Sequence, residues 1–425
     1  MNKTLAIFGG DPVNQEPFPQ WPSFSEKTKK EALSPLQNGL VNYWTGSRGI
    51  EFEEKWAKYC GCQFGVSTTN GTSALHTALA ACDIGPGDEV IVPSYSFIAS
   101  SFCVLQAGAI PIFADVRPDT HTIDPQDIKR KITPRTRAII PVHLYGIPCD
   151  MDAIMEIAQA HNLYVIEDAA QSHGSEFKGE KVGSIGHVGC FSFCQSKHFT
   201  TGGEGGCLVT NNENIAWKAR SFRDHGYDVK ERLRLLEMEK KLFYIHERVG
   251  FNYRLTEIQS IIGLSELDRF DSWNKPRRIK IGEKLLHAFQ NHPGILYLPP
   301  HKKEEKYISF WLFPIVLDTE KISCSIKDFW QAIEREGVPV SPVLWPQMYK
   351  EKAYLEHNGF GKTKFPFRSQ EYTNPESVEY QKVFCQNAAW LEERTFSFPC
   401  HPVYEDLHVD LMIEAFQKVY NYYKK

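Results

Sequence analysis

A chain of 425 residues exceeds what one hydrophobic core usually supports, so we expect two domains. Hydrophobic residues make up 42% of it and charged residues 24%, as in an ordinary globular chain that buries a sizeable core. The formal net charge of -4 provides no basic surface, so we expect neither nucleic acid nor a membrane as partner. No apolar run has the length of a signal-peptide core or a membrane span, and the eleven scattered cysteines fit reduced thiols. A cytoplasmic protein is therefore predicted.

Short apolar runs alternate with helical stretches through the first half of the chain. The runs predict strands at 89–93, 110–114, 138–142, 164–167, 189–193 and 207–210. The intervening stretches include predicted helices over 72–81 and 151–161. This order predicts an α/β fold with a mainly parallel sheet, in which ligands bind outside the carboxyl ends of the strands.

The first candidate site element is the segment 66–79, which passes from a β-branched strand through Asn-Gly into an Ala/Leu-rich helix. Free backbone N–H groups at the start of that helix, near Gly71, and the hydroxyl of Thr72 can bind an anion. Ordinary helix capping explains the same pattern. Farther on, Phe97 or Tyr95 follows a strand and can stack on a flat ring, although core packing is the commoner role of such aromatics.

A carboxylate, Asp168, falls where the predicted strand at 164–167 ends. In that place it can pair with a protonated ring nitrogen such as that of pyridoxal phosphate, which keeps the ring an electron sink. Capping of a helix is the alternative role.

Lys197 lies between an aromatic strand and the glycine-rich turn at 202–206. Restricted solvent and a backbone that lets a flat ligand approach closely suit an imine-forming amine. Ser192, five residues earlier, can donate to a phosphate. The alternative is a lysine in a surface loop, and the combination with Asp168 disfavours it.

These segments, taken in order, resemble one known family. The motifs that carry the resemblance are Asn70-Gly71-Thr72, Pro93-Ser94-Tyr95-Ser96-Phe97, the run 167–174, Phe191-Ser192-Phe193 with Lys197, Gly203-Glu204-Gly205-Gly206 and the run 250–255. The chain is similar to the DegT/DnrJ/EryC1/StrS aminotransferases, which are pyridoxal-phosphate enzymes of fold type I. The resemblance extends from about residue 5 to residue 402.

The resemblance implies a large cofactor-binding domain at 1–263, with a mainly parallel seven-stranded-type sheet, and a smaller C-terminal α/β domain at 264–425. It also implies a pyridoxal 5'-phosphate site. Its implied residues are Lys197 (Schiff base and proton transfer), Asp168 (ring nitrogen), Gln171 (ring face or 3-hydroxyl), Phe97 (stacking), and Gly71, Thr72 and Ser192 (phosphate). Asn252 would reach the phosphate of the neighbouring subunit, which implies a homodimer with shared active sites.

The resemblance further implies transfer of an amino group from glutamate or glutamine to a keto-sugar or keto-cyclitol. Arg254 can bind the donor carboxylate, unless it forms a surface salt bridge. Trp345 stands where the family often has histidine or tyrosine, and it can support a sugar ring or pack in the core.

Three other functions are weighed against this one. A sugar dehydratase of the same family would replace the lysine by histidine, and His198 adjoins Lys197; the spacing from Ser192 favours the lysine. A non-catalytic regulator is disfavoured by the intact lysine and aspartate. A nucleotide-binding protein using the turn at 202–206 is disfavoured because the turn lacks a P-loop ending. The close pair Cys60 and Cys62 has no second pair at zinc spacing, so no metal is expected.

The remaining patterns concern the second half of the chain. A charged segment at 229–241 predicts a solvated helix, or less often a dimer or substrate cover. Helical periodicity over 256–287 predicts one long connecting helix, with the domain boundary near residue 264. The segment 307–316 predicts a central strand of the second domain.

Overall fold

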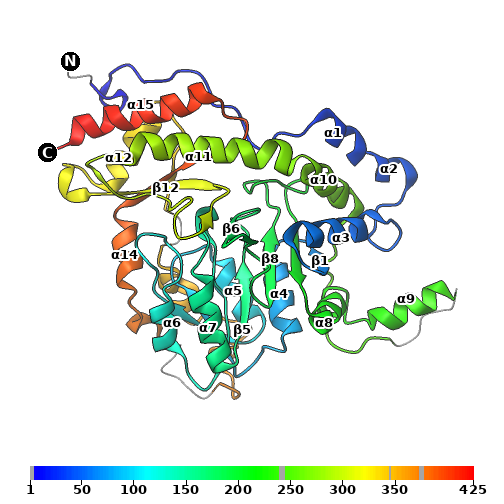
Figure 1. Ribbon diagram of the computed structural model, residues 1–425. Helices are drawn as coiled ribbons and strands as arrows, with labels where there is room; N and C mark the ends of the chain where they lie inside the picture. Colours follow the sequence, from blue (N-terminus) through cyan, green and yellow to red (C-terminus); the bar gives the residue numbers. More distant parts are fainter. Residues whose placement is uncertain (1–3, 239–244, 344–345, 373–377) are drawn as a thin grey trace.

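The computed structural model describes residues 4–238, 245–343, 346–372 and 378–425 (Figure 1). Within them, seven strands form one sheet in the spatial order β1-β9-β8-β5-β4-β2-β3. The strands are β1 Phe64–Thr68, β2 Glu89–Pro93, β3 Ile110–Ala114, β4 Thr136–Ile139, β5 Tyr164–Asp168, β8 Val188–Ser192 and β9 Gly206–Thr210. Strand β9 runs antiparallel to both of its neighbours, and the other adjacent pairs are parallel. The predicted mainly parallel sheet is confirmed.

Helices cover both faces of this sheet because its strands are apolar on both faces. Val90 and Val92 join the apolar cluster on one face, whereas Ile91 joins the cluster on the other. The first face is covered by α4 Gly71–Ala81, α5 Ala99–Gln106 and α8 Glu213–Arg223, and the second by α3 Arg48–Cys60, α6 Pro125–Lys131 and α7 Met151–His161. The helices predicted at 72–81 and 151–161 are therefore present as α4 and α7.

A second, antiparallel sheet of four strands lies in the C-terminal part, in the order β10-β12-β14-β13. Its strands are β10 Ile295–Tyr297, β12 Leu312–Leu317, β13 Ser341–Pro342 and β14 Thr395–Pro399. Three helices belong to the same region at the top of Figure 1: α11 Lys275–Phe289, α12 Ile326–Arg335 and α15 Asp406–Tyr423. A small sheet of β11 Lys306–Tyr307, β6 Glu176–Phe177 and β7 Glu180–Lys181 connects the two regions.

The remaining helices lie mostly at the periphery. They are α1 Glu26–Ala32, α2 Ser34–Asn38, α9 Val229–Glu237, α10 Glu257–Asp268, α13 Lys352–Leu355 and α14 Gln386–Glu392. The charged segment predicted as a helix forms α9, which projects from the body in Figure 1. The predicted domain boundary falls inside α10 and stays a prediction. Over the described ranges, no helix combines the length and apolar character that crossing a membrane requires.

The prediction of one helix over 256–287 is wrong, because α10 ends at Asp268 and α11 begins at Lys275. The turn between them, Phe270–Asn274, is wound more loosely than an α-helix, and Pro276 is in the first turn of α11. Asn274 uses its side-chain amide to donate to the carbonyl of His198, 2.6 Å away. The interruption thus brings a polar side chain to the loop that carries Lys197.

The prediction of a central strand over 307–316 is right for 312–316, which lie in the inner strand β12, and wrong for the residues before them. The chain leaves β11 at Tyr307 and enters β12 only at Leu312. Between them, Phe310 has a positive φ of 51°, which an extended strand cannot contain. The amide N–H of Ser309 donates to the side chain of Ser175, and that of Trp311 donates to the carbonyl of Tyr145. These N–H groups therefore bind another part of the chain instead of a neighbouring strand.

Candidate active site

Strands β1, β8 and β5 end at one edge of the large sheet, where β9 begins between β1 and β8. Ser192 at the end of β8 is opposite Gly206 of β9, and Gly206 is opposite Thr68 at the end of β1. Asp168 at the end of β5 is paired with Cys190, two residues before Ser192. The strand ends therefore bring Asp168, Ser192 and the turn before α4 into one place, although they are far apart in sequence.

Asp168 is a buried carboxylate that accepts two hydrogen bonds within the protein. Its Oδ2 accepts a hydrogen bond from the Ser100 hydroxyl at 2.7 Å, and its Oδ1 accepts one from the Ala170 N–H at 3.1 Å. Burial raises the pKa of Asp168, while these hydrogen bonds and the positive charge of Lys197 act to lower it. A cationic N–H placed against this carboxylate would stabilise its charged form.

The start of α4 and Ser192 form a close-fitting cradle. Asn70 caps the helix by accepting from the Ser73 N–H at 2.8 Å, and the first N–H groups, at Gly71 and Thr72, have no helical carbonyl to bind. A Cβ on Gly71 would lie 2.7 Å from the Cβ of Ser192. Glycine therefore lets the helix start come within contact distance of Ser192, and N–H and hydroxyl donors gather where an anion would bind.

Lys197 lies in the loop after β8, and its amine rests on an aromatic face. The Nζ atom is 4.0 Å from the centroid of the Trp311 ring. Burial lowers the pKa of Lys197 to about 8, although the Asp168 carboxylate and the Cys194 thiol act to raise it. The backbone is held as well, because the Lys197 carbonyl accepts from the indole N–H of Trp21 at 3.0 Å. The structure thus provides a fixed, partly desolvated amine.

The neighbouring His198 faces a different environment. Its Nδ1 is 3.2 Å from Nδ1 of His173, and its Nε2 is 2.8 Å from the Ser309 hydroxyl. The side chain is buried, and burial lowers the pKa of His198 well below that of a free histidine. Both ring nitrogens are engaged within the protein, so His198 is not the residue that presents a reactive group beside Asp168.

Two further predicted residues flank the strand ends. Gln171 is buried, and its Oε1 accepts from the Tyr145 N–H at 3.0 Å. Phe97 follows β2 and keeps 42% of its surface exposed. Tyr95, the other aromatic candidate, is buried and hydrogen-bonded to the Tyr145 hydroxyl at 2.9 Å, so it belongs to the core. Of the two aromatic candidates, Phe97 is therefore the one that is not buried in the core.

The residues predicted to serve substrates and the partner subunit lie elsewhere. Asn252 is exposed, beside Asp224 in an isolated bridge. Arg254 forms an ion pair with Asp224, whose carboxylate also accepts from the Trp44 indole at 2.5 Å. The contacts described for Arg254 are thus with its own neighbourhood rather than with the Lys197 loop. Trp345 lies outside the described residues.

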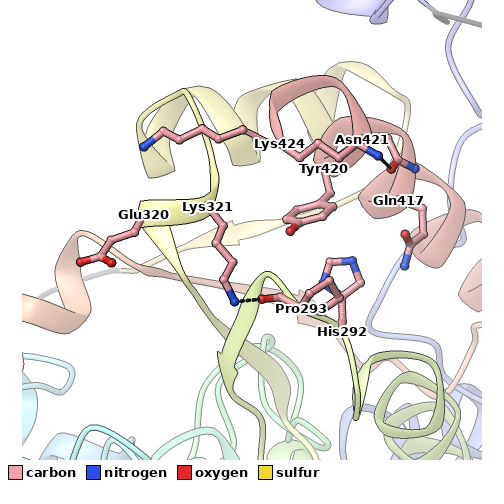
Figure 2. A pocket seen from close by; sticks show the side chains of 9 residues that line it. His292, Pro293, Glu320, Lys321, Gln417, Tyr420, Asn421 and Lys424 are labelled. Carbon is pink, nitrogen blue, oxygen red and sulfur yellow. Dashed lines mark hydrogen bonds between the residues drawn. The ribbon is translucent and has the colours of Figure 1, made fainter.

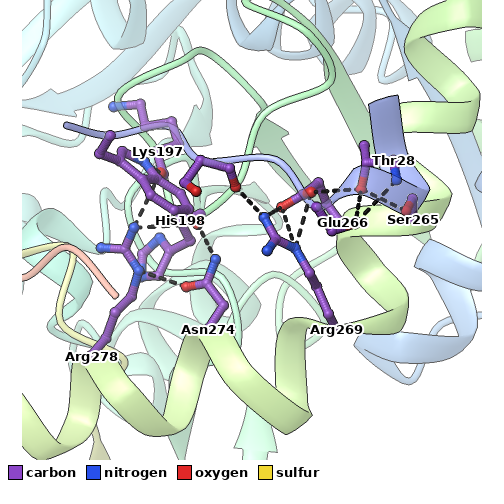
Figure 3. Close-up of polar contacts among 11 residues, drawn as sticks. Thr28, Lys197, His198, Ser265, Glu266, Arg269, Asn274 and Arg278 are labelled. Atoms are coloured by element: carbon purple, nitrogen blue, oxygen red, sulfur yellow. Dashed lines mark hydrogen bonds and ion pairs between the residues drawn. The ribbon is translucent and has the colours of Figure 1, made fainter. Parts of the chain in front are cut away.

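The structure adds residues that the sequence did not indicate, above all Arg278. Its buried guanidinium donates to the Asn274 side chain at 2.7 Å and to the carbonyls of Lys197 and His198 at 3.4 and 3.3 Å (Figure 3). It also donates to the Cys400 carbonyl at 2.9 Å. Burial lowers the pKa of Arg278 to about 9. Trp311 is a second addition, because its indole N–H donates to the Ser196 carbonyl at 2.6 Å.

A hollow of about 460 Å³ lies in the C-terminal part, away from these residues (Figure 2). It is lined by His292, Pro293, Lys321, Tyr420 and Lys424, among others, and Lys321 donates to the carbonyl of Pro293 at 2.7 Å. This hollow contains no strand end and no buried carboxylate. The chemistry-bearing side chains therefore gather at the edge of the large sheet and not in this hollow.

The chain matches one family model and is similar to a curated relative of named activity. The family model described as the DegT/DnrJ/EryC1/StrS aminotransferase family matches residues 22–374. The GDP-perosamine synthase of Caulobacter vibrioides is 41% identical over 308 residues, which are 71% of this chain and 78% of that protein.

Solved structures match nearly the whole chain. An aminotransferase from Psychrobacter cryohalolentis is 34% identical, with a TM-score of 0.82, over 95% of this chain and 99% of its own. The NtdA protein of Bacillus subtilis, solved with bound cofactor PMP, is 26% identical, with a TM-score of 0.76, over 97% of this chain and 87% of its own.

Proposed function

Because this chain belongs to the DegT/DnrJ/EryC1/StrS aminotransferase family, we propose that it transfers an amino group from glutamate or glutamine to a nucleotide-linked keto-sugar. The chain is an aminotransferase that depends on pyridoxal phosphate. The acceptor class is inferred from the relative named for GDP-perosamine synthesis. The observation that carries the proposal is the meeting of Asp168, the Gly71–Ser192 cradle and the loop of Lys197 at one sheet edge.

The residues at this edge fit the cofactor. A Cβ at Gly71 would fill the cradle, so the N–H groups of Gly71 and Thr72 and the hydroxyl of Ser192 suit its phosphate. The carboxylate of Asp168 suits its ring nitrogen, and Phe97, which follows β2 and is partly exposed, is the aromatic proposed to stack on its ring. When bound, pyridoxal phosphate supplies an aldehyde that receives the amino group and a ring that takes up electron density.

Lys197 would act both as the anchor for the cofactor and as the proton carrier. Because its pKa is lowered to about 8, the Lys197 side chain is in the neutral amine form in a larger fraction of the molecules near neutral pH than an ordinary lysine would be. The same atom can accept a proton and return it, because the two charge states lie close in free energy at that pH. Gln171 would hold the Tyr145 turn beside the ring.

The amino donor carries a carboxylate, and Arg254 is the guanidinium proposed to bind it. Its Nη1 is paired with Asp224, while its buried Nε has no hydrogen-bond partner among the residues that the structure describes. Asp224 would then orient the guanidinium for the donor. Trp345 remains a proposed support for the acceptor sugar.

A homodimer with shared sites is part of the proposal. Val249 and Phe251, just before Asn252, expose 84% and 42% of their surfaces. Leu33, Leu36 and Leu40 on the N-terminal arm are exposed as well. A second copy of the chain that covered these apolar residues would bring Asn252 to the phosphate of its partner.

The function is tested with the purified protein in its pyridoxamine phosphate form. GDP-, UDP- and dTDP-linked keto-sugars and a keto-cyclitol are added one at a time, and the absorbance of the lysine-bound cofactor is followed. We expect one nucleotide-linked keto-sugar to restore this absorbance with formation of an amino sugar. If no acceptor changes the spectrum of this form, and neither glutamate nor glutamine changes the spectrum of the pyridoxal phosphate form, the proposed function is wrong.

The shared site is tested by mixing two inactive variants, Lys197→Ala and Asn252→Ala. A mixed dimer contains one site with Lys197 from one chain and Asn252 from the other, so activity should reappear in proportion to the mixed species. Unchanged inactivity of a verified mixed dimer would place Asn252 within its own chain's site or outside any site.

A further inference from the structure

Trp311 lies where the irregular segment after β11 meets the loop of Lys197. The ring centroid is 4.0 Å from Nζ of Lys197, and the indole N–H donates to the carbonyl of Ser196 on the same loop. One side chain therefore contacts both the amine of the reactive lysine and the backbone that carries it. Trp311 itself is only partly buried.

We propose that Trp311 is a positioning residue that receives the Lys197 amine whenever this amine is not bonded to the cofactor. The proposal deepens the proposed function, since it concerns the same site and assumes the role of Lys197 in it. An aromatic face attracts an ammonium group without forming a hydrogen bond that must be broken before the amine can leave. It thus gives the charged amine a defined place from which it can return.

The backbone presents Trp311 through two left-handed residues. Phe310, just before it, has φ 51°, and Tyr145, whose carbonyl accepts from the Trp311 N–H at 3.2 Å, has φ 59°. Non-glycine residues adopt this conformation only where their surroundings determine it. Tyr145 is fixed by Gln171, and Phe310 packs against Gly282, where a Cβ would come within 2.5 Å of the Phe310 ring.

This arrangement links Gln171, a predicted cofactor-binding residue, to Lys197 through Trp311. Gln171 binds Tyr145, Tyr145 binds the backbone of Trp311, and Trp311 contacts Ser196 and Lys197. If Trp311 only packed in the C-terminal part of the chain, its indole N–H would have no reason to donate to the loop of Lys197. The geometry therefore favours a role in placing the amine over simple packing.

The charge state of the amine follows from the groups around it. Asp168 on β5 and Cys194 on the same loop favour the ammonium form, and burial opposes it. The face of the Trp311 ring also favours the ammonium form, because a cation over a desolvated ring is stabilised. Replacing the ring by an aliphatic side chain should therefore make the amine more often neutral and more reactive towards an acylating reagent at neutral pH.

The experiment uses the full-length protein loaded with pyridoxamine phosphate, so that Lys197 is unbonded whether or not the protein turns over a substrate. Acylation of Lys197 by acetic anhydride is followed by mass spectrometry between pH 6 and 10. We expect Trp311→Leu to increase the rate at pH 7 by about two- to eightfold and to lower the midpoint of the pH profile. Trp311→Phe, which keeps a ring face, should remain closer to the wild-type rate.

The matched control is Trp390→Leu. Trp390 is also a partly buried tryptophan of the C-terminal part with a cation, Arg394, 4.6 Å from its ring, but it makes no contact with the Lys197 loop among those described. Wild-type acylation in Trp311→Leu, or equal changes in Trp311→Leu and Trp390→Leu, would overturn the proposal. Because labelling requires no acceptor, the acylation of Lys197 can be interpreted even if the keto-sugar assay fails.

Discussion

The two sides of the candidate active site are built differently. On the cofactor side, Asp168 and Ser192 end two adjacent parallel strands and Gly71 begins a helix, so regular elements fix their places. On the opposite side, Trp311 belongs to an irregular segment, and Arg278 reaches the Lys197 loop from α11. Strand ends produce a site by topology alone, whereas the opposite side depends on individual long-range contacts. Substitutions on the two sides should therefore affect cofactor binding and protein stability differently.

The largest effect is expected on the cofactor side, from Asp168→Ala. Loss of a charge-assisted hydrogen bond to the ring nitrogen should weaken binding of pyridoxamine phosphate by about ten- to a hundredfold, with turnover falling further. Fluorescence titration measures the affinity. Asp119→Ala is the control, because Asp119 is a partly buried carboxylate paired with Arg117. Wild-type affinity in Asp168→Ala would show that this side is not the ring-binding side.

Arg278→Met tests the opposite side. Several carbonyls would lose a buried donor, so the free energy of unfolding should fall by about 1–3 kcal/mol and cofactor attachment to Lys197 should slow. Denaturant unfolding and stopped-flow absorbance provide the two measurements, and Arg278→Lys should partly rescue both. Arg277→Met is the matched control on the same helix, where the guanidinium donates only to the Pro402 carbonyl among its described contacts. Equal losses in the two Met variants would remove the special role of Arg278.

Gly71→Ala should produce a loss that is localised to the phosphate cradle. The new Cβ would lie 2.7 Å from that of Ser192, and crowding of this kind destabilises by about 1–3 kcal/mol. We expect weaker binding of the cofactor phosphate, which inorganic phosphate competition would report. Adding Ser192→Gly should partly restore stability, because it removes the crowding Cβ, but not phosphate binding, because it also removes the hydroxyl donor. Gly85→Ala is the control, since its Cβ would meet only an ordinary contact at 3.6 Å. Unaltered phosphate binding in Gly71→Ala would argue against the cradle.

The smallest effect is a shift in a pH profile. Cofactor attachment requires the neutral amine of Lys197, whose pKa burial lowers to about 8. The attachment rate should rise about tenfold per pH unit below this value and level off above it, because the amine is then already neutral. Removal of Asp168, which raises the pKa, should move the midpoint to lower pH. A rate that keeps rising beyond pH 10 would indicate an ordinary, solvated lysine.

The same contrast explains what the sequence could predict. Asp168, Ser192 and Gly71 follow or precede regular elements, so strand and helix patterns were sufficient to bring them together. Trp311 contacts Ser196 across 115 positions, and its segment reads as a continuous apolar strand until the left-handed Phe310 interrupts it. Arg278 lies in a helix whose periodicity gives no sign that the guanidinium is buried against carbonyls. Long-range hydrogen bonding of this kind leaves no periodic signal in the chain.

Lys197 is the residue through which amino groups are proposed to be transferred. The most direct measurement is a single half-reaction: glutamate or glutamine is mixed with the cofactor-loaded protein without an acceptor, and the released oxo acid is quantified per subunit. We expect about one equivalent from the wild type and from Lys178→Ala, an exposed lysine paired with Asp152, and none from Lys197→Ala. Release of the oxo acid by Lys197→Ala at the wild-type rate would contradict the assignment.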